Sequence, residues 1–446
     1  MTFPRNMPVQ ELLTLKSSSP ITSTVWLVFE RLTYLFLSFF VTLAIARHLL
    51  PETFGKLSYL LAMVSLVAPL MAAGLNSIIS REVLHRPIDS HLIMGSALLL
   101  RCIASVTVIP LVIGFAYLYM DSPQRELFAF LSFCSLFNAV FIVDFWLQAH
   151  VANRYGVLLR LVTLLIFSAA RLMAIEFGAE LSAFVYLAGL EVICLGLLYT
   201  MAYGRLTGGL KQLRTSWEES LRLLKDSRWL IFSGIAAVIY LKVDQVMLGI
   251  MIDDRAVGIY AAAARLSEVW YFFPAAIVVS FFPQLINKKE SDRAGYQLDI
   301  QKINDLLYCG GLSVAMVVSL SAGWFLPLLF GEAYSQAVPV LVVHVWAGVF
   351  VFMRALLSKW LITENLLKLS MMSQVLGAVF NVALNMQLIP LYGPLGAAYA
   401  TVISYVVSGY LVLFFHRDLW PMAMVVTRSI LLPIRLAQKG LGLYKT

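Results

Sequence analysis

The sequence predicts an all-α integral membrane protein with 12 transmembrane helices in two six-helix bundles. Three observations lead to this fold class: the apolar composition, the length of the apolar runs and the uneven distribution of Lys and Arg. Of 446 residues, 60% are hydrophobic and 13% are charged, whereas soluble domains are about 45–50% apolar and a quarter charged. This composition excludes a soluble enzyme. Runs of about 20 apolar residues without two-residue alternation predict helices rather than a barrel.

Breaking the apolar runs at charged and turn residues gives the predicted helices in order. They cover residues 25–46, 57–79, 92–119, 127–147, 157–175 and 181–203, then 229–251, 259–285, 306–330, 338–363, 369–389 and 395–415. The first run carries Glu30 and Arg31 at its head and is longer than the core of a signal peptide. We therefore interpret it as the first span and not as a cleaved leader.

The connections between these helices predict the orientation. Twenty-one Lys and Arg residues fall on the side of the N-terminus and four on the other side, so both termini are expected in the cytoplasm. This asymmetry also explains the pI of about 9.2 without a nucleic-acid partner. The domains are then a cytoplasmic segment 1–24, bundles 25–203 and 229–415, and two cytoplasmic amphipathic segments at the membrane surface, the linker 204–228 and the tail 416–446.

A short internal repeat relates the two halves. Pro51–Gly55, after the first predicted span, matches Asp254–Gly258, after the seventh, at an offset of 203 residues. The offset corresponds to six spans, so the halves enter the membrane from the same side and repeat about a pseudo-twofold axis along the membrane normal. Such an arrangement is typical of transporters and predicts a central cavity between the bundles.

Thirteen charged residues fall inside the predicted spans. The basic ones are Arg31, Arg101, Arg160, Arg171, Lys242, Arg265, Arg354 and Lys359, and the acidic ones are Glu30, Asp144, Glu191, Asp244 and Glu268. Each would cost about 2.5–3.5 kcal/mol at the centre of a bilayer, so they are expected to face a wet interior. The excess of cations predicts that this interior attracts anions.

Depth along the helices groups these charges. Lys242 and Asp244 on the seventh span lie at the same predicted level as Arg265 and Glu268 on the eighth, which predicts a charge cluster in the outer half of the cavity. Arg31 and Arg354 are expected in its inner part. The candidate substrate-binding residues are Arg31, Lys242, Arg265, Arg354, Arg171 and Arg101, and the candidate ion-coupling residues are Asp244, Glu268 and Asp144.

Several of these assignments have a structural alternative. The Lys242–Asp244 pair is either a static bridge or a switch that responds to protons or sodium. Arg101 and Arg171 either line the cavity or pair with Glu191 or another acid. The remaining alternatives are an Arg31–Glu30 ion pair, a helix-end role for Asp144, and extension of Arg160 and Lys359 to the cytoplasmic interface.

The sequence offers no cofactor or metal motif. It contains no Walker loop, no GxSxG and no HExxH, and its four cysteines are isolated in apolar stretches. We therefore expect no cofactor, no metal and no enzymatic activity.

Three stretches resemble the O-antigen (Wzx-type) flippases of the multidrug/oligosaccharidyl-lipid/polysaccharide exporter (MOP) superfamily. They are Val243–Gly249 with Val257–Tyr260 and Ala263–Glu268, the segment Ile389–Thr401, and the turn Leu49–Tyr59 with Gly74–Asn76. The resemblance implies a multi-pass protein of the bacterial inner membrane. It would move an undecaprenyl-pyrophosphate-linked oligosaccharide of lipopolysaccharide biosynthesis by alternating access, coupled to an H⁺ or Na⁺ gradient, with polysaccharide polymerase and chain-length proteins as partners.

The alternatives are a drug/cation antiporter of the same superfamily, a membrane glycosyltransferase or polymerase, and a transporter of a related lipid carrier. An antiporter is expected to have a more acidic or more apolar cavity. A membrane enzyme is expected to carry a large external loop, which the short outer connections do not provide.

Overall fold

The computed structural model describes residues 20–150 and 153–435. Within these ranges the chain forms helices and no strand, so the predicted all-α class is confirmed. Most of the expected N-terminal segment 1–24, and the end of the expected tail with Lys439, lie outside the described residues. Eleven of the described helices are long and apolar enough to cross a membrane.

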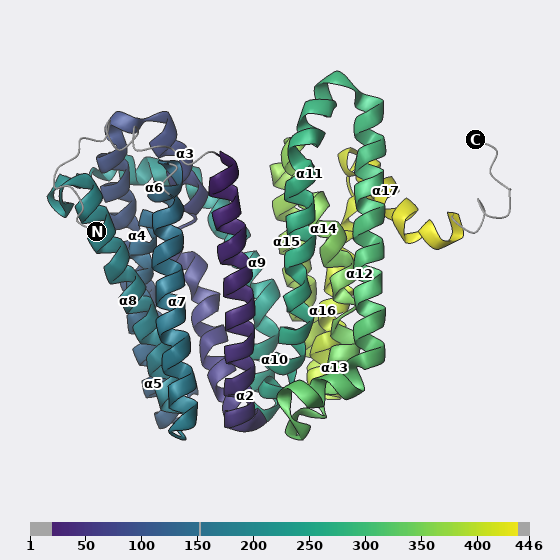
Figure 1. Cartoon of the computed structure of the whole chain (residues 1–446), viewed down its shortest axis with the longest axis horizontal. Helices are drawn as coiled ribbons and strands as arrows, with labels where there is room; N and C mark the ends of the chain where they lie inside the picture. Colours follow the sequence, from purple (N-terminus) through teal and green to yellow (C-terminus); the bar gives the residue numbers. More distant parts are fainter. Residues whose placement is uncertain (1–19, 151–152, 436–446) are drawn as a thin grey trace. The chain divides into compact units, whose positions relative to one another are not determined.

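The α-helices follow the predicted spans closely (Figure 1). Those of the first half are α2 Pro20–Ala72, α3 Asn76–His85, α4 Ser90–Tyr119, α5 Ser122–Cys134, α6 Ile142–Ala149, α7 Asn153–Glu176, α8 Leu181–Thr207 and α9 Trp217–Met251. Those of the second half are α10 Asp254–Glu268, α11 Phe272–Ser291, α12 Arg293–Phe330, α13 Ala337–His344, α14 Ala347–Thr363, α15 Leu367–Tyr392, α16 Pro394–Gly409 and α17 Trp420–Ile430.

The first two predicted spans are joined without a loop. Helix α2 covers the first span and the second as far as Ala72, and its one non-helical residue is Leu50, with φ 61° and ψ 169°. Counting the helix on each side of Leu50 as a span turns the 11 candidate spans into the expected 12. A single residue with positive φ reverses the chain here, at a position where glycine is the usual choice.

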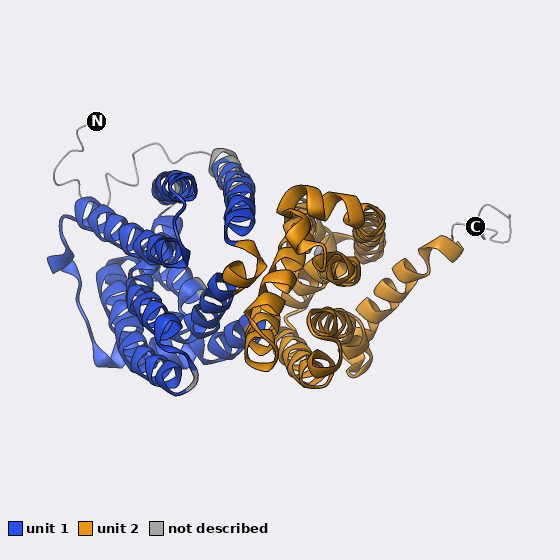
Figure 2. Ribbon diagram, turned by 90° about the horizontal axis from the view of Figure 1, so that it is seen from below, with its two compact units in different colours: residues 1–49, 56–238 blue, residues 50–55, 239–446 orange. Residues whose placement is uncertain are grey.

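The chain divides into two compact units (Figure 2). Unit 1 consists of Met1–Leu49 and Lys56–Val238, and unit 2 of Leu50–Gly55 and Ile239–Thr446. The expected linker 204–228 is not one separate helix, because α8 continues to Thr207 and α9 begins at Trp217 and runs on through the seventh span. Gly208 and Gly209, with φ of 79° and 133°, end α8.

Helix geometry breaks within the same spans of each half. The second span is interrupted at Ala73 and Gly74, which both have positive φ, and the eighth at the 3₁₀ segment Val269–Tyr271. The fourth span contains the 3₁₀ segment Ser135–Phe141, and the tenth is divided between α13 and α14. The breaks therefore recur at an interval of six spans.

The turn sequences of the repeat contact each other inside unit 2. A Cβ on Gly55 would collide with the carbonyl oxygen of Asp254, and a Cβ on Gly258 would collide with that of Pro51. At the offset of 203 residues these two contacts are equivalent. The contact is therefore reciprocal, and it requires glycine at both positions.

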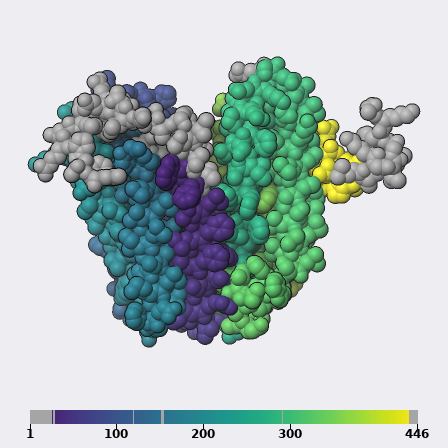
Figure 3. Space-filling view, in the orientation of Figure 1, coloured from purple at the N-terminus to yellow at the C-terminus, as the bar shows by residue number. Residues whose placement is uncertain are grey.

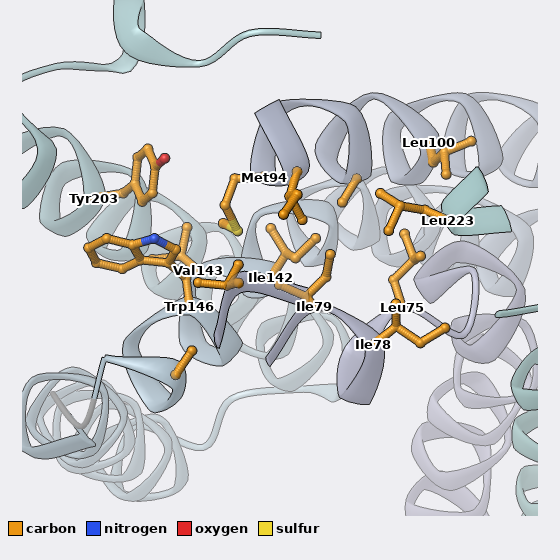
Figure 4. Close-up of a cluster of buried hydrophobic side chains, with 14 of the residues drawn as sticks. Leu75, Ile78, Ile79, Met94, Leu100, Ile142, Val143, Trp146, Tyr203 and Leu223 are labelled. Atoms are coloured by element: carbon orange, nitrogen blue, oxygen red, sulfur yellow. The ribbon is translucent and has the colours of Figure 1, made fainter. Parts of the chain in front are cut away.

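Side-chain packing separates a core from a lipid-facing surface. Leu75, Ile79, Ile142 and Trp146 pack in the core of unit 1, where α3, α4, α6 and α8 meet (Figure 4). On unit 2, α12 lies at the molecular surface (Figure 3) and exposes large apolar side chains, among them Leu320 at 89%. An apolar surface of this kind is stable against acyl chains and unstable in water.

Candidate functional site: a buried carboxylate and uneven charge pairing

Asp244 on α9 is the most enclosed acid of unit 2. Its side chain is 2% exposed. Its Oδ2 accepts hydrogen bonds from the Tyr260 hydroxyl at 2.6 Å and the Thr401 hydroxyl at 2.7 Å, and its Oδ1 accepts one from Asn385 Nδ2. Neutral donors from three other helices, α10, α15 and α16, therefore converge on this carboxylate of α9.

Further neutral groups complete this cluster. Asn385 Nδ2 also lies 3.2 Å from Asn381 Oδ1, and both amide side chains are fully buried. The His344 ring packs edge-on against Tyr260. Asn385 Oδ1, Asn381 Nδ2 and His344 Nδ1 have no hydrogen-bond partner among the described residues. Buried polar atoms without partners are rare in folded proteins, and they can accept or donate a hydrogen bond to an ordered water or hold an ion.

The predicted charge cluster on the seventh and eighth spans is not formed as expected. Lys242 makes no ion pair with Asp244 in the described structure, because residues two apart on a helix point to nearly opposite sides. The static-bridge interpretation is therefore wrong. Glu268 lies within electrostatic range of Tyr260 and His344, so it belongs to the surroundings of Asp244. Arg265 is half-buried on the same helix.

Arg354 on α14 is a cation that neutral groups surround. Its Nη1 donates to the carbonyl oxygen of Ser408 at 2.7 Å, and its Nη2 donates to Ser373 Oγ at 3.3 Å. Tyr240 and Tyr405 lie close to it, with their rings 4.3 Å apart. No carboxylate among the described residues forms an ion pair with Arg354. Unit 2 therefore holds a buried carboxylate and a half-buried guanidinium, each with neutral hydrogen-bond partners.

In unit 1, two of the intramembrane arginines, Arg160 and Arg171, form ion pairs with carboxylates. Arg160 on α7 forms ion pairs with both Glu30 on α2 and Asp144 on α6, and Tyr199 donates a hydrogen bond to Asp144 at 3.1 Å. The expected extension of Arg160 to the interface is wrong, since two carboxylates hold its guanidinium. The Arg31–Glu30 pair is also not formed: Glu30 faces Arg160, and Arg31 is exposed. Asp144 is thus an ion-pair partner and not a free helix-end residue.

The two remaining candidate arginines of unit 1 also have partners. Arg171 on α7 pairs with Glu191 on α8, one of the two alternatives left open by the sequence. Arg101 on α4 is 2% exposed and donates to the side chain of Asn76. Lys359, in unit 2, places its ammonium group 5.4 Å from the ring centre of Phe282, a cation–π contact.

Outside the spans, unit 1 has a further ion-pair network on α3. Glu82 binds Arg222 at 2.6 Å and Arg81 at 3.1 Å. Burial tends to raise the pKa of the Glu82 carboxyl, but the hydrogen bonds and positive charges of Arg222 and Arg81 outweigh it and lower that pKa overall. This network ties α3 to the first turns of α9.

The sequence analysis missed the neutral members of the Asp244 cluster. Tyr260 and Thr401 occur in the stretches that carry the resemblance, but only charged residues were considered as site residues. One signal was available: Asn381 and Asn385 lie four residues apart, on one face of a predicted span. No group of three or more His, Cys, Asp or Glu side chains in the described part of the chain is placed to hold a metal ion.

Fold and site together define a polytopic helical membrane protein that encloses charged groups within its spans. The chain belongs to the family described as polysaccharide biosynthesis protein, which matches residues 22–287. Over 244 residues it is 23% identical to the probable low-salt glycan biosynthesis flippase Agl15 of Haloferax volcanii, covering 53% of this chain and 49% of that protein. Over 195 residues it is 28% identical to the probable flippase AglR of the same organism, covering 42% and 40%. The matches thus span half or less of these curated relatives.

Solved structures share the fold over nearly the whole chain. The lipid II flippase MurJ in its inward closed conformation has a TM-score of 0.66 at 14% identity, covering 94% of this chain and 93% of MurJ. The MATE transporter VcmN of Vibrio cholerae has a TM-score of 0.58 at 13% identity, covering 91% and 96%. The resemblance to the MOP superfamily predicted from the sequence is confirmed.

Proposed function

We propose that this protein is a flippase that carries a lipid-linked oligosaccharide across a membrane by alternating access. Family membership and two relatives named as flippases support the transport of a glycan carrier. The fold shared with a lipid II flippase supports a substrate whose head group crosses while its lipid remains in the bilayer. The specific form that we propose is an undecaprenyl-pyrophosphate-linked repeat unit of O-antigen type in a bacterial inner membrane, with both termini in the cytoplasm.

The cations of the spans suit a pyrophosphate. Lys and Arg bind phosphate oxygens, Lys as a point charge and Arg through a planar fork. Arg31 and Lys242 form no ion pair with a described residue, and Arg354 has only neutral partners. Together with Arg265, they are the residues that we assign to the substrate. Arg171 and Arg101 are assigned instead to structure, since Arg171 is paired with Glu191 and Arg101 is only 2% exposed.

The buried Asp244 carboxylate is the observation that carries the coupling part of the proposal. A carboxylate enclosed by neutral groups is unstable unless a proton or a cation neutralises it. Small alkali cations prefer hard oxygen ligands. The cluster offers oxygen atoms of Asp244, Thr401, Asn381 and Asn385, and the amide oxygen of Asn385 has no hydrogen-bond partner among the described residues. We therefore propose that Asp244 alternately binds and releases H⁺ or Na⁺ as the protein changes conformation.

The first test establishes transport in the native cell. Deleting the gene should leave lipid-linked oligosaccharide on the cytoplasmic leaflet and abolish the surface glycan, and the wild-type gene should restore both. An intact surface glycan in the deletion strain contradicts the flippase assignment and favours a drug/cation antiporter or another function.

The second test addresses coupling. The purified protein is reconstituted in vesicles with a fluorescent lipid-linked oligosaccharide, and translocation is measured by access of a membrane-impermeant lectin. A Na⁺ or a pH gradient, applied separately, should accelerate translocation, and Asp244→Asn should remove that response. Asp121→Asn is the matched control, because Asp121 is exposed and its side chain caps no helix. Coupling through Asp244 is rejected if Asp244→Asn responds to both gradients like wild type.

A further inference from the structure

Unit 2 contains a cavity apart from the Asp244 cluster. It has a volume of about 1110 Å³ and lies among the first three turns of α12, the turn between α14 and α15, and helix α17. Helix α17 packs beside α12 at this end of the unit (Figure 1). None of the candidate substrate-binding or ion-coupling residues lines this cavity.

The cavity wall is rich in unneutralised positive charge. Lys289 and Arg435 line it but are already paired, with Glu364 at 3.1 Å and Asp305 at 3.3 Å. Three further arginines line the wall without an ion pair or a side-chain hydrogen bond to any described residue. They are Arg293, Arg417 and Arg428. The lining carboxylate of Asp418 faces His416 at 3.6 Å. The arrangement of the three arginines therefore favours an anion.

The cavity lies at the level of the lipid head groups. The stretch 306–330 of α12 contains no charged residue, and its 25 residues extend about 37 Å, which is enough to cross the hydrocarbon core. The lining residues Arg293 to Gln301 occupy the turns just before this stretch. Trp420, the first residue of α17, is 52% exposed, and Phe415, which precedes that helix, is 82% exposed. Exposed aromatic side chains are typical of the membrane interface.

The cavity is also lined by apolar side chains. Leu298, Trp360 and Met424 line it together with Met422 and Val425. A free phosphate ion needs only the arginines, whereas a phospholipid presents a phosphate together with glycerol and the first methylene groups of its chains. A lining that combines arginines with apolar side chains fits a phospholipid better than a free phosphate ion.

We infer that this cavity, formed by α12, α17 and the α14–α15 turn, binds the phosphate head group of an anionic phospholipid through Arg293, Arg417 and Arg428. The excess of Lys and Arg in the adjoining connections places it on the cytoplasmic side, where leaflets are anionic and basic pockets between helices bind lipid head groups. The inference goes beyond the proposed function and does not depend on which glycan is transported.

The test measures lipid retention by the full-length protein with native mass spectrometry. The protein is purified in detergent and titrated separately with phosphatidylglycerol and phosphatidylcholine. Wild type should retain one phosphatidylglycerol in preference to phosphatidylcholine. The triple variant Arg293→Gln, Arg417→Gln, Arg428→Gln should lose this preference, by roughly fivefold per arginine and on the order of 100-fold in total if each acts independently.

The matched control removes the same charge from unit 1. Arg154, Arg205 and Arg228 are also exposed and belong to connections expected in the cytoplasm. Their triple replacement by Gln should leave the preference for phosphatidylglycerol unchanged. The inference is overturned if wild type retains the two lipids equally, or if the two triple variants lose retention to the same extent.

A competition arm separates a phospholipid from the phosphorylated lipid of the proposed substrate. Farnesyl pyrophosphate, a short isoprenyl pyrophosphate, is added to wild type loaded with phosphatidylglycerol. Retention of the phospholipid at equimolar competitor supports the inference. Displacement that depends on the three arginines assigns the cavity to the isoprenyl carrier and overturns the phospholipid assignment, without affecting the gradient test on Asp244.

Discussion

The two units place charge inside the membrane in opposite ways. In unit 1, Arg160 pairs with Glu30 and Asp144, and Arg171 pairs with Glu191. Arg101 is the exception in unit 1, because it is buried and donates to the neutral side chain of Asn76. In unit 2 the carboxylate of Asp244 and the guanidinium of Arg354 are each surrounded by neutral side chains and carbonyls. Paired charges hold helices in one arrangement, whereas an unpaired buried charge depends on something that can arrive and leave. The difference assigns a structural role to the charges of unit 1 and an ion-responsive role to Asp244.

The largest effect is expected from breaking the network of unit 1. Arg160→Gln leaves the partly buried carboxylates of Glu30 and Asp144 without a cation. Removal of one partner costs about 3–5 kcal/mol for a fully buried ion pair, so the loss should approach that range. The expected result is a low yield of folded protein and a much lower melting temperature in detergent, measured by circular dichroism. Arg160→Lys keeps the charge and should recover part of the loss. A melting temperature of Arg160→Gln within error of wild type contradicts the structural role.

A second comparison between the units concerns close backbone contacts. In unit 2, a Cβ added to Gly258 would collide with the carbonyl oxygen of Pro51. In unit 1, a Cβ added to Gly95 would collide with the carbonyl oxygen of Arg214. Replacing either glycine by Ala should cost about 1–3 kcal/mol, because the backbone must move apart. The controls are Gly114→Ala and Gly323→Ala, where the Cβ meets no atom within 4 Å. Equal melting temperatures for all four variants would refute the tight contacts.

The smallest effect gives the sharpest contrast, because it applies one substitution to both units. Asp144→Asn breaks an ion pair with Arg160 and should destabilise the protein by about 1–3 kcal/mol. Asp244→Asn removes a buried charge that has no cationic partner and should leave the melting temperature unchanged or raise it. Thermal melts of both variants, side by side, check the prediction. If Asp244→Asn is the more damaging of the two, the contrast between the units is wrong.

Most of the fold could be predicted from the sequence. The apolar runs located every candidate span, because a membrane helix must satisfy its own backbone and be long enough to cross. The helix starts were less accurate, since α9 and α12 begin at Trp217 and Arg293, well before the predicted 229 and 306. The breaks at Ala73–Gly74 and Val269–Tyr271 could not be located, since apolar residues continue across both of them. The prediction also separated the linker 204–228 from the span 229–251, because the residues change from polar to apolar there. The helix α9 continues through this change.

The site was predicted less well. Asp244 was identified because a charge in a span is conspicuous, but its partners were sought among other charges at the same depth. The structure shows that helix rotation decides the partners, and that Tyr260, Thr401 and Asn385 hold the carboxylate. In unit 1, pairing over 130 residues, as between Glu30 and Arg160, depends on which helices are neighbours. A single sequence does not contain that information.

The reversal at Leu50 has a practical consequence for topology mapping. Only one residue separates two helices there, so an epitope tag or a reporter domain inserted at this point would have to unwind one of them. The turn after α7 is different, because Gly178 has positive φ and open space around it, and Phe177 is 82% exposed. Both turns are expected on the same side of the membrane, so a tag after Gly178 can report the sidedness of the first hairpin and leave that hairpin intact.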